Sequence, residues 1–144
     1  MRFVIQRVKE ASVETEAGIT GSCSNGFLIL AGICEADDKE TADKMIKKTV
    51  GLRIFTDEND KTNLSINDVK GSILLVSQFT LYADCRKGNR PSFVKAGSPE
   101  HAKEIYEYMI GEFTDKYGLK CDTGEFGAHM KVSLINDGPF TVVL

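Results

Sequence analysis

Ser77, Gln78 and Thr80 form the polar group in this sequence that most suggests chemistry, because they interrupt an apolar run. The run is SILLVSQFTLYA, and polar side chains within such a run are costly to bury unless they are hydrogen-bonded. If a strand continued through the segment, the side chains of Gln78, Thr80 and Tyr82 would share one face. Thr80 would need an activating base to act as a nucleophile, and this segment has no acidic residue before Asp84. The simplest interpretation is hydrogen bonding to neighbouring backbone at a sheet edge, with a polar functional site as the alternative.

A second segment, NDGPF, combines residue types that can fix the backbone at a binding site. Gly138 and Pro139 could present backbone carbonyls at a fixed angle. An X-Pro bond is cis in only about 5–6% of cases in folded proteins. The simplest interpretation is therefore an ordinary turn that joins two strands.

The third segment, TGEFGAHM, contains small residues that permit close approach of a ligand or of another part of the backbone. These residues are Gly124, Gly127 and Ala128. A tight bend before the MKVSLI segment would need the same residues. His129 could act as a general base near neutral pH, although an isolated histidine beside a strand is more often packed or solvated.

Residues 86–95 carry basic side chains and no acidic one. The basic residues are Arg86, Lys87, Arg90 and Lys95. A solvated loop is the simplest explanation, but the position directly after SQFTLYA also suits an anionic ligand. The formal net charge of -3 argues against a protein that coats nucleic acid non-specifically, because such binding depends on releasing counterions from many phosphates.

The cysteines are scattered along the chain without a CxxC pair, and the chain has only 2 histidines. This spacing predicts neither a zinc site nor a disulfide framework, and we expect reduced thiols, no metal and no cofactor. No apolar run approaches the roughly 20 residues that span a bilayer, and we expect no targeting segment and no membrane partner. The expectation is a soluble, cytoplasmic protein.

The elements that would position these residues follow from the periodicity of the apolar positions. Strands are predicted at 3–8 with a continuation through ASVET, at 26–33, over SILLVSQFTLYA, and in the tail at MKVSLI and FTVVL with a turn at NDGP between them. Asp37 or Asp38 can cap a helix that continues through ETADKMIKKTVGLRIF. Ser98 followed by Pro99 begins a second helix that ends near Gly118. The pattern lacks a regular βαβ alternation and predicts an α+β fold, mainly antiparallel sheets with two main helices against them, in one domain over residues 1–144.

Taken together, these segments closely resemble the D-aminoacyl-tRNA deacylase family, also called D-tyrosyl-tRNA deacylases. The similarity runs from MRFVIQRVKEASV through LRIFTDE, GSILLVSQFTLYAD, KGNRPSF and TGEFGAHM to NDGPFTVVL. The resemblance implies a barrel-like core and a homodimer with active sites at the subunit interface. It also implies hydrolysis of the ester between a D-amino acid and the terminal adenosine of tRNA, and of glycine mischarged on tRNA-Ala. In such enzymes the 2′-hydroxyl of the terminal ribose would help to activate water.

Carried onto this chain, the resemblance places the aminoacyl pocket at Ser77, Gln78, Phe79 and Thr80. The backbone amides of Phe79 and Thr80 would face the ester carbonyl, where fixed donors stabilise developing negative charge. Gly138 and Pro139 would form a Gly-cisPro element that reaches into the pocket of the partner subunit.

There this element would hold the α-amino group of the substrate and leave no room for an L side chain, which is a specificity based on exclusion. The resemblance also places the adenine against a short apolar segment, at Phe126, Gly127, Ala128 and Met130. The basic residues would contact the phosphates of the acceptor end of the tRNA, at Arg86, Lys87, Arg90 and Lys95, which is an inference from charge.

The sequence departs from the family pattern at three positions. Phe140 stands where Val is usual, Thr62 stands where Met is frequent, and His129 is not typical of its segment. We expect altered packing and retained function. Two other functions remain open, namely a non-catalytic dimer that binds tRNA or nucleotide, and an esterase that uses Thr80 as its nucleophile.

Overall fold

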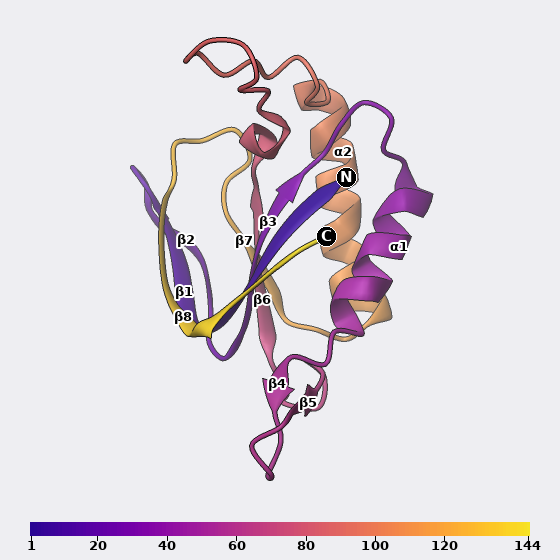
Figure 1. Ribbon diagram of the computed structural model, residues 1–144, viewed down its shortest axis with the longest axis vertical. Helices are drawn as coiled ribbons and strands as arrows, with labels where there is room; N and C mark the ends of the chain where they lie inside the picture. The colour runs from indigo at the N-terminus through magenta and orange to yellow at the C-terminus, as the bar shows by residue number, and fades with distance from the viewer.

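Two helices lie against one side of a curved β-sheet in the computed structural model, which describes residues 1–144 (Figure 1). The elements are β1 (Arg2–Thr15), β2 (Gly18–Cys23), β3 (Gly26–Gly32), α1 (Lys39–Val50), β4 (Phe55–Thr56), β5 (Thr62–Leu64), β6 (Ser72–Ser77), the 3₁₀ turn η1 (Phe79–Tyr82), α2 (Pro99–Gly111), the π-helical turn η2 (Glu112–Lys116), β7 (Cys121–Thr123) and β8 (Lys131–Val143). No helix is long and apolar enough to cross a membrane.

The main sheet curls until its two edge strands nearly meet. Its order is β2–β1–β3–β6–β7, and β8 pairs with β1 outside this path. The amide of Ser22 on β2 donates to the carboxylate of Asp122 on β7 over 3.2 Å, which links the two edges. The prediction of an α+β fold with a barrel-like sheet and two main helices is confirmed.

The first strand is the spine of this sheet. β1 pairs antiparallel with β3 along its first half, with β2 along its second half and with β8 along both. Irregularities in the register with β8 lie between Gln6 and Val8 and between Val8 and Glu10, and such bulges bend a strand and increase its twist. The strand predicted at residues 3–8 and its continuation through ASVET therefore form one bent strand.

The middle of the sheet is parallel, which the prediction of mainly antiparallel pairing did not include. β3 pairs parallel with β6, and β6 pairs parallel with β7. Parallel neighbours need crossover connections, and α1 and α2 lie in these two connections. β3 and β6 are buried on both faces, with Phe27 and Ile73 in the core under the helices and Leu28 and Leu74 in a second apolar cluster.

The two helices begin where the sequence predicts. Asp38 is the N-cap of α1 and accepts a hydrogen bond of 2.8 Å from the amide of Thr41. The expected extension of this helix through LRIF is wrong, because α1 ends at Val50 and the chain turns at Gly51 into β4. α2 begins at Pro99 and continues through η2 to the left-handed Gly118, whose φ is 65°.

Two expectations about the functional segments are also wrong in detail. β6 ends at Ser77, and the residues from Phe79 onward form a 3₁₀ turn, so the predicted alternation of Gln78, Thr80 and Tyr82 along a strand does not occur. The NDGP segment does not reverse the chain. β8 passes through it as one strand, and residues 137–140 bulge out between the pairs Val8–Asn136 and Gln6–Thr141.

Candidate active site

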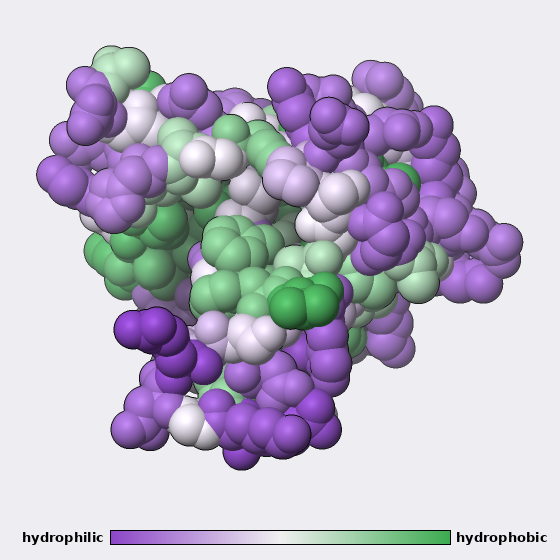
Figure 2. Space-filling model, turned by 90° about the horizontal axis from the view of Figure 1, so that it is seen from above, coloured by the Kyte–Doolittle hydropathy of each residue, from purple (hydrophilic) through white to green (hydrophobic).

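A cavity of about 540 Å³ opens at the end of the molecule where β3 and β6 finish. Ligands of parallel sheets commonly bind outside the carboxyl ends of the strands. Seen from above, apolar side chains gather around a hollow on this face (Figure 2). The lining residues come from the ends of β3 and β6, from the loop before α2 and the start of that helix, and from the segment that leads into β8, namely Ala31, Ile33, Val76, Ser77, Gln78, Phe79, Phe93, Ala96, Gly97, Pro99, Ala102, Phe126, Gly127, Ala128, His129, Met130 and Val132. The cavity thus brings together the segments predicted to bind the aminoacyl group and the adenine.

The η1 turn leaves two backbone donors unpaired beside this cavity. The amide of Gln78 still donates to Ala31 of β3 over 2.8 Å, but the amides of Phe79 and Thr80 donate to no acceptor in the chain. The first amides of a helical turn have no partner within the turn. This pair is therefore available to an oxygen atom of a ligand.

No acid–base pair stands next to these donors. The hydroxyl of Thr80 accepts a hydrogen bond from the side-chain amide of Gln78, and an amide cannot take the hydroxyl proton. Thr80 itself is outside the cavity lining, and His129 is the one histidine that lines the cavity. His129 is solvent-exposed and forms no hydrogen bond. The geometry supports a binding pocket with fixed donors and gives Thr80 no activating base.

Phe126 lies in the cavity wall and packs against a buried tyrosine of α2. Its ring lies 5.7 Å from that of Tyr106 on α2. The hydroxyl of Tyr106 donates to the carbonyl of Leu75 over 2.6 Å, and the amide of Gly124 donates to the same carbonyl over 3.1 Å. Burial raises the pKa of Tyr106, so it remains a neutral donor. The carbonyl of Leu75 therefore connects α2, β6 and the loop before β8, close to the end of β6.

The predicted basic residues divide into two groups. Arg86 and Lys95 both pair with Asp84, with the Lys95 ammonium 3.7 Å from the carboxylate. Hydrogen bonds from Arg86 lower the pKa of Asp84 to about 2, so this carboxylate is charged under all ordinary conditions. Lys87 and Arg90 are exposed and have no ion-pair partner.

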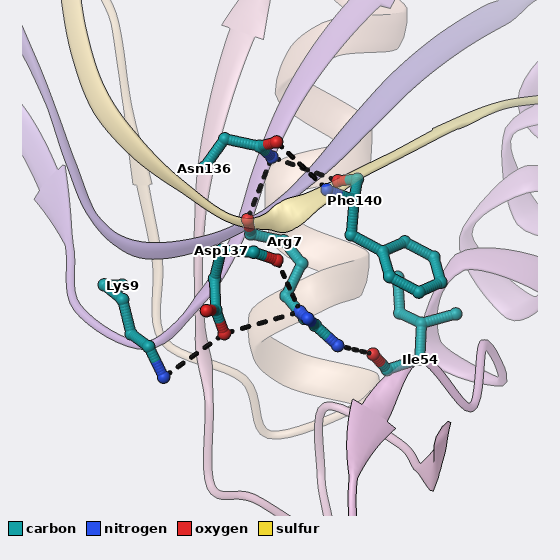
Figure 3. A network of polar contacts seen from close by, with 6 residues as sticks. All are labelled: Arg7, Lys9, Ile54, Asn136, Asp137 and Phe140. Carbon is teal, nitrogen blue, oxygen red and sulfur yellow. Dashed lines mark hydrogen bonds and ion pairs between the residues drawn. The ribbon is translucent and has the colours of Figure 1, made fainter. Parts of the chain in front are cut away.

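Gly138 and Pro139 are not part of the cavity in this chain. The peptide bond between them is cis, and Gly138 has a φ of 144°. They lie in the bulge of β8, where Arg7 reaches Ile54 just before β4 (Figure 3). β4 and the loop before α2 lie at opposite ends of the molecule (Figure 1). The structure therefore does not bring Gly138 and Pro139 together with the other predicted site residues.

Arg7 organises the bulge, and sequence reasoning missed it. Its guanidinium donates to the carbonyl of Asp137 over 2.9 Å and to that of Ile54 over 2.6 Å. It also lies 4.8 Å from the centre of the Phe140 ring, so the bulky residue at this position packs on a cation. Asn136 closes the bulge by bonding the carbonyls of Arg7 and Phe140 over 3.1 and 3.0 Å (Figure 3). A lone arginine in the apolar run FVIQRV was the signal available in the sequence.

Comparisons with known proteins identify relatives that match the whole length of this chain. A family model described as D-Tyr-tRNA(Tyr) deacylase matches residues 4–144. The chain is 53% identical to the D-aminoacyl-tRNA deacylase of Thermosipho africanus and 53% identical to that of Koribacter versatilis, over 100% of this chain and 96% of each relative.

Solved structures show the same fold. A structure titled c-Myc DNA Unwinding Element Binding Protein superposes with a TM-score of 0.93 at 37% identity, covering 100% of this chain and 97% of that one. A structure titled as a probable eukaryotic D-amino acid tRNA deacylase superposes with a TM-score of 0.88 at 14% identity, covering 99% and 97%, and supports the fold alone. The chain therefore belongs to the D-Tyr-tRNA(Tyr) deacylase family, whose members are ester hydrolases acting on aminoacyl-tRNA.

Proposed function

We propose that the cavity is the aminoacyl pocket and that the chain, as one domain, removes D-amino acids and glycine from mischarged tRNA in the cytoplasm. The observation that carries this proposal is the pair of unpaired amides, those of Phe79 and Thr80, at a pocket without an acid–base pair. An ester carbonyl bound to these amides would gain stabilisation as negative charge develops on its oxygen. The four cysteines are free thiols, which suits a reducing compartment.

Catalysis in this proposal depends on the substrate itself. Water attacks the ester carbonyl carbon, the bond to the ribose 3′-oxygen breaks, and that oxygen leaves with a proton as a hydroxyl. The adjacent 2′-hydroxyl helps to activate the water, while Ser77, Gln78 and Phe79 hold the ester in the pocket. Positioning of this kind can supply much of a rate enhancement, and it requires no base from the protein.

Chirality is enforced by the partner subunit in a homodimer. Gly138 and Pro139 lie far from the cavity of their own chain, and β8 leaves the apolar side chains of Ile135 and Val143 exposed. A long exposed edge strand with apolar side chains is suited to pairing with another chain. Carbonyls of the bulge would bind the substrate's α-amino group, and the rigid bulge would exclude an L side chain. Glycine has no side chain to exclude and would be accepted.

The tRNA end would extend from this pocket toward two surfaces. The adenine would lie against the wall held by Tyr106, at Phe126, Gly127, Ala128 and Met130. Lys87 and Arg90 are the basic residues free to contact phosphates, while Arg86 and Lys95 share their charge with Asp84. A few such contacts reconcile an RNA ligand with the acidic net charge of -3.

The deciding experiment compares one tRNA charged with D-tyrosine and with L-tyrosine, at low enzyme concentration. We expect rapid loss of the D-ester and the spontaneous rate for the L-ester. Binding of charged tRNA without accelerated hydrolysis would instead support a non-catalytic binding dimer. Equal hydrolysis of both esters would show that the Gly138–Pro139 element does not exclude L side chains.

The same assay separates the two mechanisms. We expect Thr80→Ala to retain substantial activity, since its hydroxyl has no activating base. A substrate with a 2′-deoxy terminal ribose should lose most of its reactivity. Normal hydrolysis of the deoxy substrate, together with an inactive Thr80→Ala variant, would favour the esterase with a Thr80 nucleophile.

A further inference from the structure

Asp84 ties together the two ends of the loop that follows η1, which we call the basic loop and define as residues 84–97. Its backbone forms a reciprocal pair with Ser92, with N–O distances of 2.7 and 3.0 Å. Its carboxylate accepts hydrogen bonds from the amide of Arg86 over 3.1 Å and from the Arg86 guanidinium, and it also pairs with Lys95. Both ends of the loop are therefore bound to the same residue, Asp84.

This loop supplies one wall of the aminoacyl pocket. Phe93 directly follows Ser92, lines the cavity, and meets the ring of Phe79 edge-on with centroids 5.1 Å apart and planes at 73°. Such edge-to-face pairs contribute beyond the area that they bury. At its far end the loop is fixed by a bond of 2.9 Å from the amide of Gly97 to the carbonyl of Ile33. Between these two fixed ends, the contacts of Asp84 and a bond of 2.9 Å from the amide of Ala96 to the carbonyl of Phe93 fix the segment that carries Phe93.

Exposed ion pairs usually contribute little, but this group differs from a typical surface pair. Both carboxylate oxygens of Asp84 are bound by the Arg86 guanidinium, and two-pronged pairs of this type have a fixed geometry. The Asp84 side chain is only 23% exposed, although that of Arg86 is 79% exposed. Several donors on one carboxylate form the kind of network in which surface charges do matter.

We propose that Asp84 is a positioning residue for deacylation, which closes the basic loop so that Phe93 and Phe79 together hold the aminoacyl ester. The proposal rests on the proposed function of the cavity. It gives the acidic residue of this basic segment a role that is separate from phosphate binding. Because Asp84 acts through Phe93, its loss should affect the reaction of bound substrate more than the capture of tRNA.

The test measures hydrolysis of D-tyrosyl-tRNA in single turnover, with enzyme in excess, so that the maximal rate and the half-saturating enzyme concentration are obtained separately. We expect Asp84→Asn and Phe93→Ala each to lower the maximal rate by about tenfold, because small misplacements of a reacting group have large effects. The double variant should be no slower than the slower single variant. Asp60→Asn, which removes the same charge at a carboxylate without hydrogen bonds, and Asn89→Ala at the loop tip should leave the maximal rate unchanged.

A second measurement follows the loop directly. Trypsin cuts after lysine and arginine, and it should nick the basic loop of Asp84→Asn several times faster than that of the native chain while the rest of the molecule resists. A maximal rate for Asp84→Asn within twofold of the native value, or effects of Asp84→Asn and Phe93→Ala that multiply, would overturn the proposal and leave the proposed function intact. Failure of the native chain to accelerate loss of the D-ester would overturn the proposed function itself.

Discussion

Arg7 is a buried cation on a largely apolar strand, and its contacts connect β1, β8 and the residue before β4. The side chain is 10% exposed and makes two hydrogen bonds to carbonyls as well as an ion pair with Asp137. Lysine cannot reproduce the planar fork that reaches both carbonyls. We expect Arg7→Lys to lower the free energy of unfolding by about 2 kcal/mol, the range for hydrogen bonds to charged groups. Urea denaturation at neutral pH measures this change.

Lys9 provides the matched control for this prediction. Its ammonium pairs with the same Asp137 carboxylate over 3.2 Å, but its side chain is 61% exposed. Exposed pairs contribute between about 0 and 1 kcal/mol, so Lys9→Ala should change stability far less than Arg7→Lys. Equal effects of the two substitutions would show that burial of the guanidinium is not what stabilises the bulge.

Which individual residues can be identified from sequence depends on how local their environment is. The segments with Ser77 and Phe126 were predicted to form one site, and both line the same cavity. Arg7 and Phe93 were missed, because their roles come from partners that the fold brings near them, such as Asp137 for Arg7. The periodicity of a sequence does not predict contacts between residues so far apart in the chain.

The ends of strands were the hardest feature to predict among the helices and strands. An apolar run continued from β6 into FTLY, and periodicity cannot indicate that hydrogen bonding along the strand stops at Ser77. In β8 the turn-forming residues NDGP produced a bulge, since both halves of the strand still pair with β1. Tertiary pairing thus overrode local turn preference. The interiors and starts of the helices, which depend on local caps and stripes, were predicted correctly.

Helix α1 offers a test of its cap through pH. Hydrogen bonds from Thr41, first from its hydroxyl and then from its amide, lower the pKa of Asp38. A lowered pKa in the folded state stabilises the fold above the ordinary aspartate pKa of about 4, and this contribution is lost as pH falls through the lowered value. Asparagine also caps helices well. We expect Asp38→Asn to be close to native stability at neutral pH and to lose less stability on acidification.

Urea denaturation at neutral pH and at about pH 3 gives the two free energies that this prediction compares. Asp60→Asn serves as the control, because the Asp60 carboxylate accepts no hydrogen bond in the structure. Its acid-induced loss of stability should match that of the native chain. If Asp38→Asn lost as much stability on acidification as the native chain, the pKa of the Asp38 carboxyl would not differ between the folded and the unfolded chain, and this prediction would be wrong.

Across the full chain, the two halves of the proposed site lie apart. The cavity opens where β3 and β6 finish, whereas the cis Gly138–Pro139 bulge lies toward β4 (Figure 1). A symmetric dimer joins such separated patches twice, since each patch of one copy meets the other patch of its partner. In the proposed homodimer, a second copy would bring its bulge to the cavity and complete the pocket.

Mixing two inactive variants tests this arrangement. Gly138→Val should displace the bulge, because a Cβ at Gly138 would lie 2.9 Å from the amide nitrogen of Phe140, and Ala128→Trp should fill the cavity. Each homodimer has two damaged sites, but a mixed dimer has one pocket whose lining and bulge are both native. After co-refolding in equal amounts, about half of the dimers are mixed and we expect about a quarter of native activity to return. Ala128→Trp refolded alone should stay inactive, and an equally inactive mixture would mean that each pocket uses the bulge of its own chain.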